Sequence, residues 1–272
     1  MAATPGGYVA AMATLDIDGQ LIGYAVEGEG TPLLLVHGTT MNRTGFDTVR
    51  AAMPADAAYQ YVMIEFPGSG ESAMPTEPLT VEALAAQGHA LMTHLGHSSY
   101  HVAGYSLGAV VAAGVAGLYP GSVLSATLIA GWITTDARMR ATFELWKRLI
   151  VADKELFMRY AFCDGLTADA HVMMEPILEM AIGMGVPTIA EGSLAHLDLD
   201  IAVDIPEIVA SITAPTLIIG GAEDRWVDIR HSHALGAAIA GSRVETMPAG
   251  HLMITECAAP IAELLHAHIA AA

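Results

Sequence analysis

Residues 100–118 contain an apolar run that passes into a small-residue helix with no linking loop. Tyr100–Gly104 reads as a buried strand, Gly-Tyr-Ser-Leu-Gly occupies 104–108, and Ala109–Leu118 reads as a helix. A turn from strand to helix within one residue strains the corner residue, and flanking glycines relieve the crowding between the two elements. We therefore expect Ser106 to lie exposed at a helix N-terminus, where the helix dipole and free N–H groups stabilise a developing anion. An ordinary N-cap serine is the alternative.

The rest of the chain alternates short apolar runs with alanine-rich stretches of helical length. This order is typical of an α/β fold, a mostly parallel sheet of about eight strands with helices on both faces. Pro32–Val36 contains no alternating polar residue, so we expect a central strand that is buried on both faces. Thr80 is placed as the N-cap of a helix over residues 80–95. The other expected strands are Ala13–Ile17 and Leu21–Val26, joined by a turn at Asp18-Gly19, and residues 61–65, 100–104, 123–129, 215–219 and 243–246.

The strand signals stop between Trp132 and about Ile205. Apolar residues recur there at helical spacing, and proline and glycine divide the segment into several short helices. We predict an inserted helical cap, or lid, over residues 133–205, and a core formed by residues 1–132 and 206–272. The apolar residues at helical spacing are Met139, Phe143, Trp146 and Ile150, and the breaks fall at Pro176, Gly183, Gly185 and Pro187.

Charge and cysteine content exclude several classes of function. Acidic residues outnumber lysine plus arginine by 29 to 11 in the 272 residues, so a nucleic acid or an anionic membrane surface would repel the chain. The two cysteines, Cys163 and Cys257, lack metal-ligand spacing, which favours reduced thiols over a disulfide or a zinc site. No export signal is recognisable, and no apolar stretch reaches the roughly 20 residues of a membrane span. We expect a cytoplasmic protein, and the sequence allows a homodimer without fixing the oligomeric state.

Three motifs resemble the alpha/beta hydrolase superfamily, and the resemblance extends over nearly the whole chain except the cap. It implies an oxyanion hole formed by the backbone N–H groups of Thr39 and of Leu107, the residue after the serine. Glu65 stands where the family usually has aspartate, which weakens any inference about ion pairing in its loop. The motifs are Gly104–Gly108, Val36-His37-Gly38-Thr39 and Glu65-Phe66-Pro67-Gly68-Ser69-Gly70-Glu71-Ser72.

A serine nucleophile needs a base within hydrogen-bond reach and a third group that holds the tautomer of that base. The order of these groups along the chain in the family is serine, acid, histidine. Asp224 follows a strand at the position that matches the family's acid, and Glu223 and Asp228 in the same loop are the alternatives. His251 follows Gly250 after the last strand, as in the family's histidine turn, and is the expected base.

The other histidines suit this role less well. His37 resembles the family's structural histidine, and His231 and His233 lack the supporting carboxylates of a metal site. No metal or organic cofactor is therefore expected. The remaining candidates lie before the nucleophile strand or within the last helix, and they are His97, His101, His266 and His268.

The cap is expected to place an apolar pocket over Ser106, suited to an acyl chain or a hydrophobic ring. Packing of the cap against the core explains any single apolar side chain equally well. The residues expected to contact substrate are Tyr105, Trp132, Phe143, Trp146, Met180 and Leu252.

The resulting hypothesis is hydrolysis of a small hydrophobic acyl substrate through an acyl-enzyme. A carboxylic ester or lactone is favoured, followed by a thioester. A cofactor-free haloperoxidase, a perhydrolase or a C–C bond hydrolase would use the same three residues, and a non-catalytic ligand receptor is a third class. Dehalogenases and epoxide hydrolases of this superfamily need a carboxylate nucleophile, so Ser106 argues against both.

Overall fold

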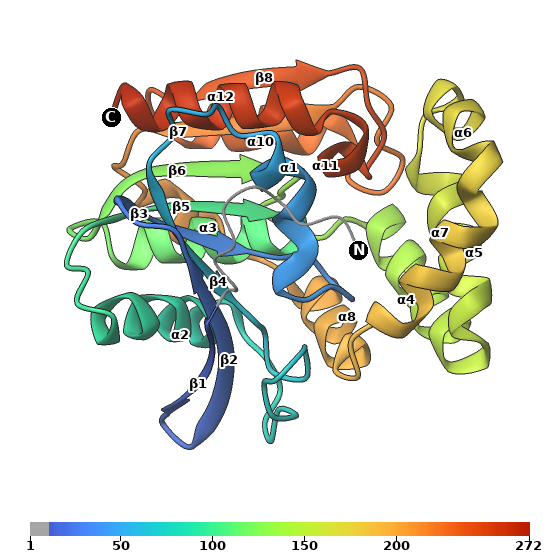
Figure 1. Ribbon diagram of the computed structural model, residues 1–272, viewed down its shortest axis with the longest axis horizontal. Coiled ribbons are helices and arrows are strands. Elements are labelled where there is room, and N and C mark those ends of the chain that lie inside the picture. The colour runs from blue at the N-terminus through green and yellow to red at the C-terminus, as the bar shows by residue number, and fades with distance from the viewer. Residues whose placement is uncertain (1–10) are drawn as a thin grey trace.

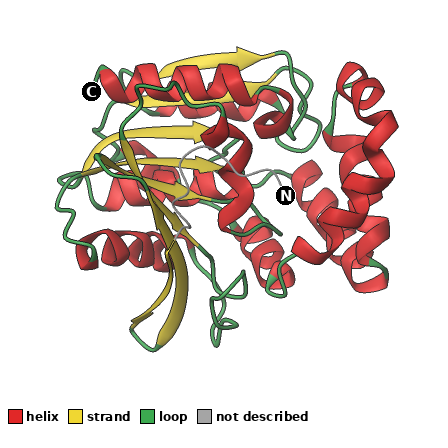
Figure 2. Cartoon of the chain, in the orientation of Figure 1, coloured by secondary structure: helices red, strands yellow, loops and turns green. Residues whose placement is uncertain are grey.

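The computed structural model describes residues 11–272 (Figure 1). Eight strands form one sheet in the order β1-β2-β4-β3-β5-β6-β7-β8, with helices on both faces (Figure 2). β2 pairs antiparallel with β1 and with β4, and the pairs from β4 to β8 are parallel. The expected α/β architecture is confirmed. The strands are β1 (Ala11–Ile17), β2 (Gln20–Glu27), β3 (Thr31–Val36), β4 (Tyr59–Ile64), β5 (Tyr100–Tyr105), β6 (Val123–Ile129), β7 (Thr216–Gly221) and β8 (Arg243–Met247).

Strand β3 is apolar from Pro32 to Val36, and helices cover both of its faces. Successive side chains of a strand point to opposite faces. Leu34 and Val36 accordingly join one apolar cluster, whereas Leu33 and Leu35 join the other. Burial of each such side chain stabilises the fold by roughly 1.5–3 kcal/mol. The expectation of a central strand buried on both faces is confirmed.

The register of β3 and β5 brings two of the sequence motifs together. Val36 pairs with Gly104, so the residues that follow each strand leave the sheet side by side at its carboxyl edge. These residues are His37–Thr39 after β3, and Ser106 after Tyr105, the last residue of β5. In an open α/β sheet, ligands bind at this edge.

Two layers of helices enclose the sheet. Thr80 caps α2 as expected, because its side chain accepts a hydrogen bond from the Ala83 amide at 3.1 Å. Helices α2, α3, α9 and α10 bury their apolar side chains against one face, and α1, α11 and α12 against the other. Their bounds are α1 (Asp47–Ala51), preceded by η1 (Arg43–Phe46), α2 (Val81–His94), α3 (Leu107–Leu118), α9 (Pro206–Ala210), α10 (Ile229–Ala238), α11 (Met253–Glu256) and α12 (Ala258–Ala270).

The segment between β6 and β7 is helical. Its two ends run side by side, because the Thr135 amide donates to the Val203 carbonyl at 2.9 Å and the Ile205 amide to the Ile133 carbonyl at 3.0 Å. Figure 1 shows α4–α7 beyond the arrowheads of β5 and β6. The division at 133–205 into a separate cap domain stays a prediction. The segment contains α4 (Ala137–Ala152), α5 (Lys154–Gly165), α6 (Ala168–Met174), η2 (Glu175–Ile177), α7 (Leu178–Gly185), η3 (Val186–Thr188) and α8 (Ser193–Ala202).

Two expectations from composition concern the cysteines and membrane-spanning helices, and the structure of residues 11–272 bears on both. Cys163 and Cys257 are both free thiols. No single helix in this range has the length and apolar character of a membrane span, although the bent pair formed by Ala168–Thr188 and Ser193–Ala202 has both when taken together.

Candidate active site

Ser106 occupies the one-residue corner between β5 and α3. Its φ of 56° and ψ of −123° lie in a region that a residue with a side chain rarely adopts, at a cost of about 1–3 kcal/mol. A Cβ atom at Gly104 would lie 2.0 Å from the Gly108 carbonyl oxygen, and one at Gly108 would lie 2.0 Å from that of Val36. Only glycine fits at these two positions, so the motif letters follow from the tightness of the corner.

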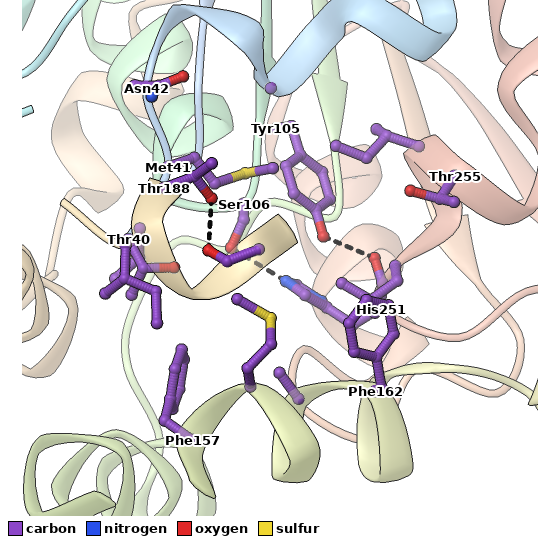
Figure 3. Close-up of a pocket in the computed structure, with 18 of the residues that line it drawn as sticks. Thr40, Met41, Asn42, Tyr105, Ser106, Phe157, Phe162, Thr188, His251 and Thr255 are labelled. Carbon is purple, nitrogen blue, oxygen red and sulfur yellow. Dashed lines mark hydrogen bonds between the residues drawn. The ribbon is translucent and has the colours of Figure 1, made fainter. Parts of the chain in front are cut away.

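Ser106, His251 and Asp224 form one hydrogen-bonded chain at the carboxyl edge of the sheet. The Ser106 Oγ lies 3.1 Å from His251 Nε2 (Figure 3). On the other side of the ring, His251 Nδ1 lies 2.7 Å from Asp224 Oδ2. All three side chains are buried. Because Nδ1–H donates to the carboxylate, Nε2 is left to accept the serine proton.

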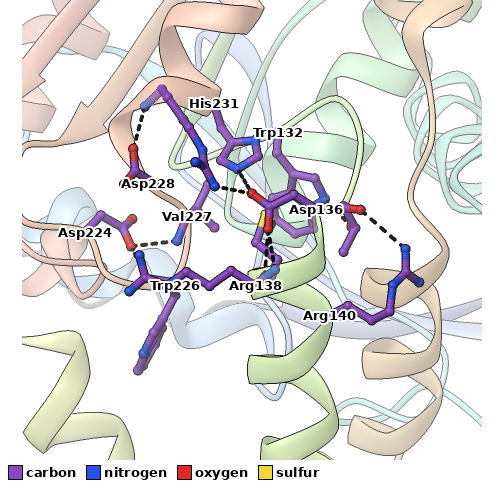
Figure 4. A network of polar contacts seen from close by, with 12 residues as sticks. Trp132, Asp136, Arg138, Arg140, Asp224, Trp226, Val227, Asp228 and His231 are labelled. Atoms are coloured by element: carbon purple, nitrogen blue, oxygen red, sulfur yellow. Dashed lines mark hydrogen bonds and ion pairs between the residues drawn. The ribbon is translucent and has the colours of Figure 1, made fainter.

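Asp224 is fixed by its own loop. Its Oδ1 accepts hydrogen bonds from the amides of Trp226 at 2.9 Å and Val227 at 2.8 Å, the second of which is drawn in Figure 4. The other oxygen is thereby directed at His251. The alternatives from the sequence, Glu223 and Asp228, do not take this position. Asp228 instead accepts from the Arg230 amide as the N-cap of α10.

The imidazole of His251 is held by its neighbours. The Tyr105 hydroxyl donates to the His251 carbonyl oxygen at 2.8 Å, and the Trp226 ring centroid lies 4.9 Å from that of His251. Burial, with smaller effects of Asp224 and Glu256, raises the pKa of Tyr105 well above its ordinary value. Tyr105 therefore remains protonated and a hydrogen-bond donor at neutral pH.

Thr39 and Leu107 flank Ser106 from two different elements. Leu107 is the first residue of α3, where backbone N–H groups have no partner within the helix. Thr39 lines the same cavity as Ser106, and its Oγ1 donates to Asp200 Oδ2 at 2.7 Å. The Ala190 amide also donates to the Thr40 carbonyl at 3.0 Å, so the cap segment supports this loop from outside.

A cavity of about 290 Å³ opens beside Ser106. Tyr105, Trp146 and Leu252 line it, together with Ser106 and His251. Its walls come from the loop after β3, from α4 and α5 of the cap, and from the loops after β7 and β8. The space lies where a reacting carbonyl could meet the serine oxygen.

The chain matches the alpha/beta hydrolase family over residues 33–264. It belongs to this family. Over 238 residues the chain is 28% identical to the pyrrolizixenacetamide deacetylase of Xenorhabdus hominickii, which covers 85% of this chain and 88% of that protein. The enol-lactonase from Burkholderia xenovorans has the same fold, with a TM-score of 0.84 at 19% identity over 95% of this chain and 100% of that one. A thermophilic esterase from Thermogutta terrifontis also has this fold, with a TM-score of 0.81 at 20% identity. The match covers 95% of this chain and 97% of that one.

Three residues expected to contact substrate in this alpha/beta hydrolase lie away from the cavity. Trp132 is fully buried and donates through Nε1 to Thr135 Oγ1 at 2.8 Å. Phe143 packs between Trp132 and Trp146, with ring centroids 5.9 and 5.6 Å away. Met180 is 59% exposed on α7. Trp132 and Phe143 pack the cap against the core. Helical spacing alone does not distinguish the helix face that packs against the core from the face that lines the cavity.

None of the six residues expected to contact substrate lies on α5, yet α5 forms one wall of the cavity. Phe157, Met158, Ala161 and Phe162 all line the cavity. They recur at positions i, i+1, i+4 and i+5, which is the spacing of one helix face. This spacing in the sequence indicates that the four side chains share one face of a helix, but it does not indicate which part of the protein that face contacts.

Asp200 is a second residue that the sequence did not single out. It lies on α8, is fully buried, and its Oδ1 has no hydrogen-bond partner among the described residues. Burial raises the pKa of Asp200 to about 8, although the hydrogen bond from Thr39 acts in the opposite direction. The carboxyl group beneath the Thr39 loop is therefore mainly protonated at neutral pH.

His37 and Glu65 brace the loops around the site. The Phe66 amide donates to His37 Nε2 at 3.1 Å, while Nδ1 lies 2.8 Å from the Gly38 carbonyl. Burial lowers the pKa of His37 to about 3, so the ring is neutral. Glu65 is fully buried and pairs with Arg43 at 2.6 Å. In this hydrolase the loop thus keeps an ion pair despite the glutamate.

His231 belongs to a polar network at the start of the cap. Its Nε2 lies 3.0 Å from Asp136 Oδ2, and Arg230 pairs with the same carboxylate (Figure 4). Asp136 also caps α4, so the network connects the cap to α10. Within residues 11–272, no cluster of histidine, cysteine or acidic side chains has the geometry of a metal site.

Proposed function

We propose that this protein hydrolyses a carboxylic ester or lactone of a small hydrophobic acyl group, with Ser106 as nucleophile, His251 as general base and acid, and Asp224 as the group that orients the histidine. The hydrogen-bonded chain of these three side chains at the wall of an apolar cavity is the observation that carries the proposal.

The proposed reaction has two halves. His251 accepts the hydroxyl proton as Ser106 Oγ attacks the carbonyl carbon, and the backbone N–H groups of Thr39 and Leu107 stabilise the resulting oxyanion. The protonated histidine then gives the proton to the leaving alcohol as the acyl-enzyme forms. Water, deprotonated by His251, attacks the acyl-enzyme, and the acid leaves as the serine is reprotonated.

Two further observations favour an ester or lactone over other uses of the same residues. The cavity wall is mainly apolar around Ser106, which suits acyl groups, and the proteins of the same fold include an esterase and an enol-lactonase by name. A thioester would follow the same steps. The reaction requires no metal or organic cofactor, since the chain itself supplies base and oxyanion donors.

Removal of the Ser106 hydroxyl tests this proposal. Ser106→Ala should lower kcat/KM for p-nitrophenyl butyrate by at least about 10³-fold, because no other group can form the acyl-enzyme. A fluorophosphonate probe should label the native protein and leave the variant unlabelled. Ser98→Ala removes an exposed hydroxyl that precedes β5, at the opposite end of this strand from Ser106, and serves as the control. Undiminished turnover by the Ser106→Ala protein would refute the proposal.

Amide hydrolysis is a second candidate, favoured by the deacetylase that aligns with 85% of this chain. The same acyl-enzyme would form from an acetamide, with an amine as the leaving group. Release of p-nitroaniline from p-nitroacetanilide at a rate that Ser106→Ala abolishes would support it. Turnover of the ester without any turnover of the anilide would restrict the protein to esters.

A further inference from the structure

The wall of the cavity carries no formal charge of its own. Among the described residues that line it there is no lysine, arginine, aspartate or glutamate. Its ionisable side chains are Tyr105 and His251, and both are already engaged, the first with a backbone carbonyl and the second with Asp224 and Ser106. A charged substrate group would therefore find no counterion within the cavity.

The surroundings of the cavity also disfavour a negative charge. Asp224 lies directly behind His251, and the whole chain carries a formal net charge of −18 at pH 7. A carboxylate moved from water into this space would lose its hydration without gaining a partner. It would also repel the oxyanion that forms at the carbonyl carbon. An anion in the substrate thus opposes both binding and reaction.

The two sides of the cavity differ in polarity. Figure 3 shows Phe157 and Phe162 on one side of Ser106, and Thr40, Met41 and Asn42 on another. The aromatic side belongs to α5 of the cap, where Met158 lies between the two rings in sequence.

The polar side consists of neutral groups that are largely occupied. Asn42 Oδ1 accepts from the Thr44 amide at 2.9 Å and from Thr44 Oγ1 at 2.7 Å, which leaves the carboxamide N–H groups to donate. The Thr48 hydroxyl donates to the Ile254 carbonyl, and that of Thr188 donates to the Gly185 carbonyl. These groups can form hydrogen bonds with a neutral carbonyl, ether or hydroxyl, but they cannot neutralise an ion.

We propose that the substrate is an uncharged ester, lactone or amide, with a compact apolar group against the α5 wall and, at its other end, a neutral hydrogen-bonding group toward residues 40–48. This inference rests on the proposed function and deepens it. The volume of about 290 Å³ lies just below the range of roughly 300–1,000 Å³ for ligand pockets, which agrees with a small substrate.

The experiment compares three p-nitrophenyl esters that differ at one terminal group. The butyrate ends in a methyl group, the hemisuccinate in a carboxylate, and the 4-(trimethylammonio)butyrate in a quaternary ammonium. We expect kcat/KM to be at least about 20-fold higher for the butyrate than for either ion, because neither ion has a partner in the cavity. The cation is included because aromatic rings attract quaternary ammonium groups.

A charge placed in the wall should change this preference. Met158→Lys puts an ammonium group on the α5 wall and should reduce the butyrate-to-hemisuccinate ratio by at least about 5-fold. Met173→Lys makes the same substitution on α6 at a side chain that is 79% exposed, and should leave the ratio unchanged. Thr188→Lys repeats the test from η3 at an exposed residue, in case Met158→Lys does not fold.

The outcomes separate this inference from the function on which it rests. No turnover of any ester, and no labelling by fluorophosphonate, would refute the proposed function. Turnover of the hemisuccinate or of the cation as fast as the butyrate would leave the mechanism intact and overturn the neutral substrate. A ratio that stays the same in folded Met158→Lys and Thr188→Lys would likewise overturn it, because charge would then not be what excludes the anion.

Discussion

Asp200 connects the cap to the loop that carries Thr39 through one buried hydrogen bond. Its Oδ2 accepts from Thr39 Oγ1, and its backbone carbonyl accepts from the Thr135 hydroxyl. An ionised carboxylate at this position would be buried without a cation, and it would lie close to the expected oxyanion. The protonated form avoids both costs, which is the state that a pKa of about 8 favours at neutral pH.

This raised pKa predicts how stability changes with pH. Asp200 has an ordinary value of 3.8 in the unfolded chain and about 8 in the folded protein. Between these values the unfolded chain releases a proton that the folded protein keeps. The contribution of Asp200 to stability is therefore fully present below pH 3.8 and is lost as pH rises through 8, at about 1.4 kcal/mol per pH unit.

Asp200→Asn keeps an acceptor for Thr39 but cannot ionise. The unfolding free energy of the native protein, relative to this variant, should fall by about 3 kcal/mol from pH 5 to pH 7. Urea unfolding at pH 5, 6 and 7 measures the difference, from which the other titrating groups cancel. Asp198→Asn, at an exposed position of the same helix, is the control. A difference that does not vary with pH would contradict the prediction.

The residues of the candidate site differ in how far the sequence predicts them. Ser106 is identifiable because a corner that only glycine can flank leaves a local signature, and Asp224 and His251 follow from their places after strands. Asp200 and Phe157 leave no such signature. Their importance depends on which loop or cavity they meet, and that is decided by the packing of α8 and α5 rather than by local sequence.

At the scale of elements, the C-terminal end of α5 is attached to the loop that carries His251. The Leu252 amide donates to the Gly165 carbonyl at 3.0 Å. Glu256 Oε2 accepts from Thr167 Oγ1 at 2.7 Å, and its Oε1 accepts from the Gly250 amide at 3.1 Å. One carboxylate thus holds both the residue before the histidine and the start of α6.

Substitutions of Thr167 and of Glu256 should have different kinetic effects. Thr167→Val removes the hydrogen bond from the Thr167 hydroxyl to Glu256 and the side-chain cap of α6, but leaves the bonds that Glu256 accepts from the Thr167 and Gly250 amides. Because a loosened α5 forms a poorer cavity wall, we expect KM for p-nitrophenyl butyrate to rise by about 5-fold with little change in kcat. Glu256→Ala also releases the histidine loop, so kcat should fall as well.

Thr167→Ser keeps the hydroxyl and is the matched control for this pair, expected to behave as the native protein. Steady-state kinetics on the three variants give the required split between KM and kcat. If Thr167→Val and Glu256→Ala lowered kcat equally, the two hydrogen bonds would act as one structural unit, and the assignment of separate roles would fail.

For the whole molecule, the sheet is the part that the sequence predicts best. Buried parallel strands such as β3 are nearly continuous apolar runs, and their parallel pairing follows from the alternation with helices. Their spatial order, with β3 between β4 and β5, is not predicted by this alternation. The cap is predicted less well, because its helices face the core, the cavity and solvent. Helical spacing alone does not tell which side of a helix meets which of these. Met180 illustrates this: it is expected from the sequence to contact substrate, yet α7 presents it to solvent.

Net charge and the outer surface of the cap together predict when copies of the molecule associate. Repulsion at a formal net charge of −18 opposes association at pH 7, but the charge approaches zero near the isoelectric point of about 4.8. Met173 and Met180 are 79% and 59% exposed on α6 and α7, so this apolar face is then free to associate. Dynamic light scattering should show the hydrodynamic radius rising as pH falls from 7 toward 5.

Replacing both methionines tests which surface is responsible. Met173→Gln combined with Met180→Gln should suppress the rise in radius without changing the radius at pH 7, since neither side chain contributes to the core. Far-UV circular dichroism at each pH separates association of folded copies from acid unfolding. An equal rise in the double variant, with the fold retained, would show that loss of repulsion alone drives association and that the cap methionines have no part in it.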